Sequence, residues 1–427
     1  MNILLQNLRI TLPVFFHVIA MAFSILMLPR PGYSINIDEA ISLAERNLPS
    51  YKAAKLEVQS TENLYKASLS PYLPSLDTST SQEYHDTTPE DFDLNTYDVT
   101  LSYLLFDGGR RKANRNIAEL NLDITRQEQD KNLLDLEFNV KSSFYTAIAR
   151  KEILEQRKIQ LEDARKDHEV AQGRYKFGVA KLSDVLQASV RLEQARFKLV
   201  QAEGELAIGL ANLNSLLGRD LNMVYDLDGR LSFEMAAPHL DLLSQAALKR
   251  PEIKQAEDLL KISKQNKSLE ISAFFPDITA NTSYSRADAD RAIDDRSVGI
   301  KATWNIFELG KFYRTKSAQL EIHVSEENIN ETIRQLLLDV KRAYEDFLTA
   351  SKNISVAQEQ LAQAEQNYSQ AFGEYKVGKG DILSLVQAES FLSTAREQLT
   401  TSKLNHILAK SLLERIAGID KLESFQY

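Results

Sequence analysis

The sequence predicts a mainly α-helical protein with a small β part, built from long antiparallel coiled-coil hairpins and internally duplicated. Three observations predict this fold class. Glycine (15) and proline (10) are scarce in 427 residues, and scarce helix breakers favour long helices. Several motifs recur after 200 to 202 residues, which indicates a tandem duplication. Apolar residues alternate in some segments and recur at three- and four-residue steps in others, which indicates strands and helices respectively.

Residues 1–34 differ from the rest of the chain. Arg9 precedes a mostly apolar run, and a small-x-small site ends at Ser34. This layout is typical of a secretory signal peptide cleaved after Ser34, and a retained membrane anchor is the alternative interpretation. No later stretch approaches the roughly 20 apolar residues of a spanning helix. An exported chain would therefore enter a membrane only as a β-barrel.

The remaining chain divides into two copies of one plan. The first structural repeat is predicted at 35–220 and the second at 251–420, joined by an equatorial linker at 221–250 and followed by a tail at 421–427. The paired motifs are NLPSYKAAK and KRPEIKQAE, SPYLPSL and SAFFPDI, LLFDGGR and NIFELGK, and LNSLLGRD and LERIAGID.

Each repeat begins with a short helix, about 50–70 and 252–271, and continues with a β-hairpin, about 72–107 and 274–307. Apolar residues alternate with polar ones in YDVTLSYLLF, from Tyr97 to Leu105, and in SVGIKATWNIF, from Val298 to Ile306. Such alternation fits a transmembrane barrel and equally fits a half-buried soluble sheet. Four strands cannot close into a barrel, so a membrane location would require several chains to combine.

A long helical hairpin follows in each repeat, at about 110–217 and 311–417. The first arm has about 65 residues and spans roughly 100 Å, whereas the return arm, from about 182, spans roughly half of that. On the return arm, apolar residues from Leu192 to Leu217 form a narrow coiled-coil seam. Because the return arm covers only half of its partner, we expect the preceding short helix to stack on it end to end and cover the rest.

The two arms are joined by a duplicated turn, RYKFGVAKLSDVLQA in the first repeat and EYKVGKGDILSLVQA in the second. Gly178 and Gly378 are predicted to end the first arms with positive φ. These turns, the opening DEAISLAERNLPSYKAAK and the junctions LLFDGG and IFELG resemble the TolC-like outer-membrane efflux proteins over about 36–420. The resemblance implies a homotrimer whose chains share one outer-membrane β-barrel, four strands from each protomer, and extend it as an α-helical barrel.

The resemblance also implies a function. The protein would be the passive outer-membrane channel of a tripartite efflux or type I secretion system in a Gram-negative bacterium, extending into the periplasm. Its partners would be outer-membrane lipid, a periplasmic membrane-fusion adaptor and an inner-membrane pump of the RND, ABC or MFS type. The alternative function is an exported soluble coiled-coil scaffold.

Composition argues against other classes. Cysteine is absent, the six histidines are scattered, and the net charge is −9. These features predict no enzyme, no cofactor, no metal site and no nucleic-acid partner.

Two sets of tip residues are candidate functional sites. Phe177-Gly178-Val179 and Val377-Gly378-Lys379 match the tip motif that family adaptors engage.

For the aperture gate, the resemblance points to Asp184 and Tyr375, and we add Asp381, which lies close to the family's constricting aspartates but out of phase with them. We predict a weak latch between Asp184 and Tyr375. The alternative role for Asp184 is to stabilise the first turn of its own helix. Family positions for a tip arginine and two constricting aspartates hold Gly380, Ser384 and Gln387 here, so we do not expect a strong cation-binding ring.

Overall fold

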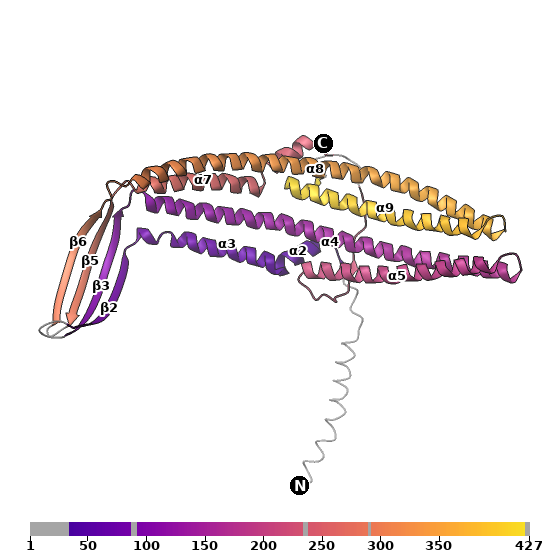
Figure 1. The fold of residues 1–427 in the computed structure, drawn as a ribbon, viewed down its shortest axis with the longest axis horizontal. Helices are drawn as coiled ribbons and strands as arrows, with labels where there is room; N and C mark the ends of the chain where they lie inside the picture. The colour runs from indigo at the N-terminus through magenta and orange to yellow at the C-terminus, as the bar shows by residue number, and fades with distance from the viewer. Residues whose placement is uncertain (1–33, 87–91, 234–237, 289–291, 423–427) are drawn as a thin grey trace, which may run out of the picture.

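The computed structural model describes residues 34–86, 92–233, 238–288 and 292–422. The molecule is elongated, with a β-sheet at one end, two glycine turns at the other, and long helices between them (Figure 1). The predicted signal peptide at 1–34 lies outside the described residues apart from Ser34. The predicted tail at 421–427 is described only for its first two residues.

The same order of elements occurs twice along the chain. The first half contains β1 (Ser34–Ile35), α2 (Ile37–Asn47), α3 (Pro49–Ala67), the 3-10 turn η1 (Ser70–Tyr72), β2 (Ser75–His85), β3 (Phe92–Phe106), α4 (Arg110–Lys176) and α5 (Leu182–Leu216). The second half contains β4 (Asp226–Leu227), α6 (Leu240–Ala247), α7 (Pro251–Ser272), β5 (Asp277–Asp288), β6 (Ala292–Thr303), α8 (Leu309–Lys376) and α9 (Ile382–Ala417). Strand β1 pairs in parallel with β4.

One strand ends earlier than the sequence indicates. We expected the apolar alternation of the last strand to continue to Ile306, but β6 ends at Thr303. The indole N–H of Trp304 donates to the carbonyl oxygen of Phe274 at 3.0 Å. This bond ties Trp304 to the turn between α7 and β5, and the apolar pattern of the sequence runs past the end of the strand.

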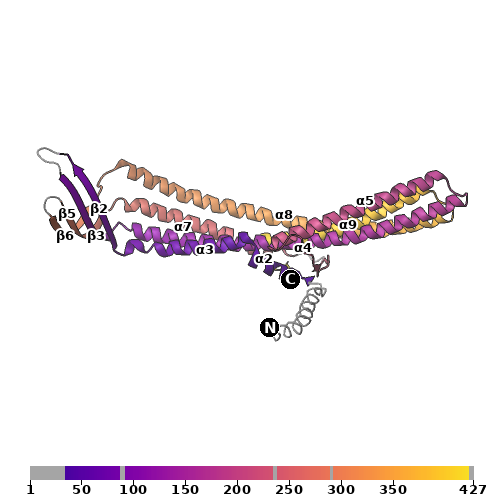
Figure 2. The same ribbon diagram turned by 90° about the horizontal axis from the view of Figure 1, so that it is seen from below.

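Strand order and helix order coincide. The sheet is antiparallel with the order β2-β3-β5-β6. Helix α3 precedes β2, β3 precedes α4, α7 precedes β5, and β6 precedes α8. In the helical layer α4 contacts α3 and α7, and α7 contacts α8 (Figures 1 and 2). The four strands therefore continue as four helices in the same lateral order, and β2 with α3 and β6 with α8 form the two open edges.

The return helices complete this layer towards the tips. Helix α5 continues the line of α3 along α4, and α9 continues the line of α7 along α8 (Figure 1), which is the end-to-end arrangement that the helix lengths predict. Ala188, Ala195, Ala202 and Gly209 recur every seven residues on the buried face of α5. Small side chains at this spacing let α5 approach α4 closely along a narrow seam.

Two apolar clusters hold the middle of the molecule together. The first includes Phe144, Leu213 and Ile35, and the second includes Phe347, Leu413 and Leu243. Each cluster lies where a return helix meets the short helices of its repeat. Among the described residues, no helix combines the length and apolar character needed to cross a bilayer.

Candidate functional site

The sheet has one apolar face and one polar face. Val99 pairs with Tyr284, and Leu101 pairs with Thr282, which in turn pairs with Val298. Directly paired residues point to the same side of a sheet, so the apolar stripes predicted for β3 and β6 share one face. Ser283 lies on the other face, opposite Thr100 and Ser297.

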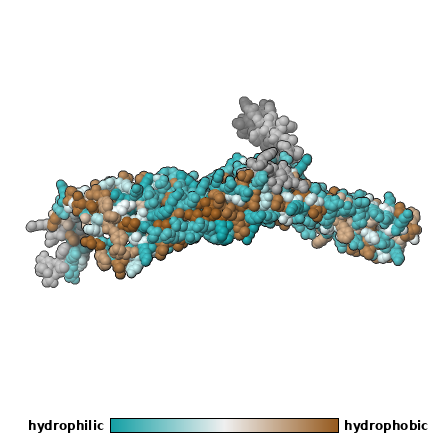
Figure 3. All heavy atoms as spheres, turned by 90° about the horizontal axis from the view of Figure 1, so that it is seen from above, coloured by the Kyte–Doolittle hydropathy of each residue, from teal (hydrophilic) through white to brown (hydrophobic). Residues whose placement is uncertain are grey.

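The apolar face is exposed in the single chain. Val298 is 89% exposed and Ile300 is 73% exposed. In Figure 3 apolar surface gathers towards the strand end and in a band near the middle of the molecule. An apolar surface of this extent indicates a site of contact with lipid or protein.

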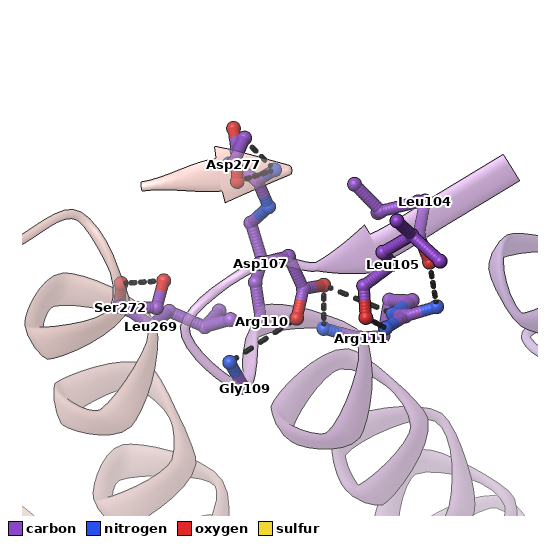
Figure 4. Close-up of polar contacts among 9 residues, drawn as sticks. All are labelled: Leu104, Leu105, Asp107, Gly109, Arg110, Arg111, Leu269, Ser272 and Asp277. Atoms are coloured by element: carbon purple, nitrogen blue, oxygen red, sulfur yellow. Dashed lines mark hydrogen bonds and ion pairs between the residues drawn. The ribbon is translucent and has the colours of Figure 1, made fainter. Parts of the chain in front are cut away.

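The turn from β3 into α4 is stabilised by a buried carboxylate (Figure 4). Asp107 accepts hydrogen bonds from the backbone N–H groups of Gly109 (3.1 Å) and Arg111 (2.7 Å). The guanidinium of Arg111 donates to the carbonyl oxygens of Leu104 (2.6 Å) and Leu105 (3.2 Å). Two carbonyls near the end of the strand and two amides at the start of the helix are thereby satisfied.

This turn also joins the two repeats. Arg110 Nη2 lies 2.9 Å from both carboxylate oxygens of Asp277, the first residue of β5 (Figure 4). Gly108 has φ +65°, and a Cβ there would lie 2.7 Å from the carbonyl oxygen of Ser272. The close approach therefore requires glycine, and it fixes the first junction against the end of α7.

The two helical tips have the same backbone. Gly178 and Gly378 have φ of 74° and 82°. The N–H of Val179 bonds the carbonyl of Arg174 at 3.0 Å, and that of Lys379 bonds the carbonyl of Glu374 at 2.9 Å. These bonds and the glycine conformation define a Schellman motif at each tip.

The residues predicted to contact an adaptor lie on the outside of these turns. Phe177 is 85% exposed, and Val377 and Val179 are also well exposed. Lys379 is exposed beside them. The tips thus present apolar side chains next to a cation at the end of the molecule farthest from the sheet.

Tyr375 lies between the two tips and is 1% exposed. The guanidinium of Arg174, at the end of α4, lies 4.6 Å from the centroid of its ring. Arg174 also donates to the carbonyl oxygen of Tyr375. Burial raises the pKa of the Tyr375 phenol, Arg174 lowers it, and the charge of Asp184 raises it.

Asp184 does not hydrogen-bond to Tyr375 in this structure. The Tyr375 hydroxyl has no hydrogen-bond partner among the described residues. The Asp184 carboxylate accepts bonds from the backbone N–H of Lys181 (3.4 Å) and the hydroxyl of Ser183 (3.3 Å). These donors belong to the start of its own helix, α5, where Asp184 lies in the first turn, as the alternative role expects.

Asp381, unlike Asp184, is the N-cap residue of its return helix, α9. Its carboxylate accepts bonds from the backbone N–H of Ser384 (2.7 Å) and from the hydroxyl of the same residue (3.2 Å). The bond from the backbone N–H lowers the pKa of Asp381. The side chain is exposed at the tip.

Sequence reasoning missed the contact of Arg174 with Tyr375. The available signal was a reversal of charge between the repeats, because Arg174 occupies the position of Glu374 in an otherwise similar turn. Across the part of the chain that the structure describes, no group of three or more His, Cys, Asp or Glu residues could hold a metal ion.

A family model described as outer membrane efflux protein matches residues 40–219 and 242–418. The chain belongs to this family. The outer membrane efflux proteins are located in the outer membrane and extend into the periplasm. The family consists of passive channels rather than enzymes, and an efflux channel role follows for this member.

Solved structures of outer-membrane channels have the same fold. CusC matches with a TM-score of 0.79 at 20% identity, covering 92% of this chain and 96% of that one. The outer-membrane channel OprN matches at 0.77 and 16% identity, covering 92% and 91%. VceC from Vibrio cholerae matches at 0.77 and 17% identity, covering 90% and 96%. A sequence search of curated proteins found no match.

These findings confirm the predicted fold class and outer-membrane location of this efflux protein. The roles of the individual tip residues stay predictions.

Proposed function

We propose that this outer membrane efflux protein is a homotrimeric exit duct of a tripartite efflux or type I secretion system. It would conduct substrate passively, with a periplasmic adaptor and an energised inner-membrane pump of the RND, ABC or MFS type. The observation that carries the proposal is the shared lateral order of strands and helices. A single ring of protomers would close both layers.

The strand layer needs such closure. Strands β2 and β6 are the outer strands of a four-stranded sheet, and their free edges would expose unpaired backbone groups to lipid. Pairing β2 of one copy with β6 of the next removes these edges and makes a closed barrel. The exposed apolar face would then contact lipid, and the Ser- and Thr-rich face would line the lumen. Transmembrane channel formation by CusC, which shares the fold, is consistent with this arrangement.

The helical layer has matching faces. Helix α5 buries small residues against α4, yet it also exposes a stripe of larger apolar side chains. This α5 stripe consists of Leu182, Leu186, Val190, Phe197 and Ile208. At the opposite edge, the tip half of α8 exposes Val356. Two different apolar edges on one chain suit a head-to-tail ring, in which each edge meets its counterpart on the next copy.

The tips would meet the adaptor. Phe177 and Val377 at the two turns are apolar and exposed, and exposed aromatic and aliphatic side chains are the usual anchors of protein interfaces. Opening of the aperture would separate the second tip from the first, where Arg174 covers Tyr375. Asp184 would act on this contact through its charge or through a bond formed in the assembled trimer.

Two measurements on the purified protein test the duct. The mass of the detergent-solubilised particle should be that of three chains, and planar bilayers containing it should conduct ions. Cell fractionation should leave the protein in the outer membrane after a salt wash. A monomer that salt releases into solution would contradict the channel and favour the exported coiled-coil scaffold.

The α5 stripe gives a matched pair of variants. Phe197 is 71% exposed, so Phe197→Glu should leave the single chain folded but place a carboxylate in the interface and reduce the trimer fraction. Phe197→Leu keeps an apolar side chain there and should retain the trimer. Equal trimer fractions for both variants would exclude this stripe from the interface.

The gate has its own test. Asp184→Ala and Tyr375→Phe should raise single-channel conductance or open probability if the side chains restrain the aperture. Unchanged conductance in both variants would remove the latch.

A further inference from the structure

A polar seam joins the two helical hairpins between the tips and the middle of the molecule. It runs along the contact of α4, in the first hairpin, with α8 and α9, in the second. The contacts are Gln156 with Thr400 (2.8 Å), Arg157 with Ser393 (2.9 Å) and Glu397 (2.6 Å), Gln160 with Glu389 (3.2 Å), Asp163 with Arg396 (3.8 Å), and Asp167 with Tyr368 (3.4 Å). Residues of this seam are not used by the tip contacts described above.

Asp167 is the member of the seam whose charge is least compensated. It is 5% exposed, and the Tyr368 hydroxyl donates to it over a long 3.4 Å bond. Among the described residues no lysine or arginine forms an ion pair with Asp167. A buried carboxylate without an ion-pair partner is costly, because it has lost its hydration.

The ionisable groups around Asp167 come from each helix that packs near it. Helix α4 contributes Asp163, α8 contributes Tyr368, α9 contributes Glu389, and α5 contributes Arg191. Arg191 is engaged elsewhere, because its Nε donates to the buried carboxylate of Glu389. Asp163 likewise has its own cations, Lys166 at 3.6 Å and Arg396 at 3.8 Å.

Protonation of Asp167 removes the free-energy cost of burying its charge. Burial, and then the charges of Glu389 and Asp163, raise the pKa of Asp167 to about 7, while the Tyr368 hydroxyl and Arg191 lower it. A carboxyl group in water has a pKa near 4. Near neutral pH the packed hairpins therefore hold Asp167 in a mixture of its neutral and charged forms.

We propose that Asp167 makes the contact between the two hairpins responsive to protons, tight when its carboxyl is neutral and loosened when the carboxyl is charged. The geometry carries this assignment, because four helices from both hairpins meet at one buried carboxyl. The link to channel opening rests on the proposed function, in which the hairpins separate at the aperture. The change within the chain does not depend on it.

The direction follows from proton binding. Packed hairpins bind the Asp167 proton more tightly than separated, hydrated hairpins do. Raising the pH from about 4 to about 7 therefore favours separation, and the effect levels off outside this window. Each pH unit within it can change the equilibrium by up to tenfold.

Hydrogen exchange of the full-length protein tests the contact directly. Backbone amides in the tip halves of α4 and α9 are compared between the wild type and Asp167→Asn at pH 5.5 and pH 7.5. Because the two proteins are compared at the same pH, the pH dependence of the intrinsic amide exchange rate cancels. Wild-type protection, divided by that of the variant at the same pH, should fall at least tenfold between pH 5.5 and pH 7.5. An equal ratio at both values would overturn the proposal.

A second variant keeps the test independent of how Asp167→Asn folds. Asp163→Asn removes one nearby negative charge and leaves Asp167 and the Arg191–Glu389 pair in place. The midpoint of the wild-type protection change should move to lower pH in this variant. An unchanged midpoint would assign the change to another group and overturn the role of Asp167.

Bilayer recordings separate this inference from the proposed function. The wild type should open more often at pH 7.5 than at pH 5.5, and Asp167→Asn should be equally closed at both. No conductance under any condition, with the exchange result intact, would contradict the channel and leave the proton-responsive contact supported. Conductance whose pH dependence survives in Asp167→Asn would overturn the inference and leave the channel supported.

Discussion

The two helical tips have the same backbone and opposite side-chain environments. Both turns end on a glycine with positive φ and make the same pair of bonds. Yet Tyr175 is 45% exposed, whereas its counterpart Tyr375 is 1% exposed. Duplication preserved the turn, and packing of the second tip against the first made the two copies unequal.

The difference is also one of charge. Arg174 in the first tip covers the second, whereas the carboxylate of its counterpart Glu374 accepts a hydrogen bond from Gln370 on its own helix at 3.0 Å. The first return helix has its aspartate in the first turn, at Asp184, and the second has it at the cap, Asp381. The first tip therefore provides the arginine of the contact, and the second tip provides the tyrosine. Identical hairpins would not show this asymmetry.

The largest expected effect contrasts the two tyrosines. Tyr375→Ala should destabilise the folded protein by about 3 to 5 kcal/mol, because it leaves a cavity in the tip cluster. Tyr175→Ala should cost less than about 1 kcal/mol. Chemical unfolding in detergent, followed by circular dichroism, measures both. Similar losses would show that the tips are equivalent in solution.

The next contrast concerns the charged pair. Arg174→Ala should cost about 1.5 to 3 kcal/mol, since it removes a hydrogen bond from a charged donor and a cation–π contact. Glu374→Ala removes an exposed side chain and should change the unfolding free energy by less than about 0.5 kcal/mol. The same unfolding assay measures both variants. A larger loss of unfolding free energy for Glu374→Ala than for Arg174→Ala would contradict the asymmetry between the tips.

Substitution of the two tip glycines should lower stability equally, because their backbone conformations are the same. Gly178→Ala and Gly378→Ala each place a side chain in the left-handed region, at a cost of about 1 to 2 kcal/mol. A Cβ at Gly178 meets nothing within 4 Å, and one at Gly378 makes only ordinary contact with Arg174. A difference above about 1 kcal/mol between them would mean that the backbones differ as well as the side chains.

The smallest effect is a pH dependence of the Asp381 cap. The pKa of Asp381 is lowered by the Ser384 N–H, so its stabilising contribution is present above pH 4 and is lost as the pH falls through the lowered pKa. Hydrogen exchange in the first turn of α9 should therefore accelerate below pH 4 in the wild type relative to Asp381→Ala. Asp184→Ala should alter α5 less, because its bond to Lys181 is longer. If exchange in Asp381→Ala also accelerates below pH 4, a group other than Asp381 causes the acceleration.

Local patterns predicted the elements well. The long arm expected at 110–174 occurs as α4, Arg110–Lys176, and the return arm expected from 182 begins at Leu182. Period-two alternation also placed β3, but it extends beyond β6, which ends at Thr303, next to the Trp304 bond to Phe274. Periodicity reports which face of an element is apolar, and it does not report where a tertiary bond interrupts that element.

The candidate site was only partly visible in the sequence. The tip glycines were evident because a turn with positive φ restricts residue type. Arg174 over Tyr375 and Tyr368 beside Asp167 were not, since each contact joins residues about 200 positions apart. Asp184 was assigned a distant partner, but the donors of its own helical turn are nearer.

The sequence alone determined the duplicated helical plan, the glycine turns and the membership of an efflux channel family, because these depend on residue order and local periodicity. Only the tertiary structure decided which tip is buried, which carboxyl lacks a cation and which edges stay open. Burial and charge compensation depend on side chains that different parts of the chain bring together, and no local pattern encodes them.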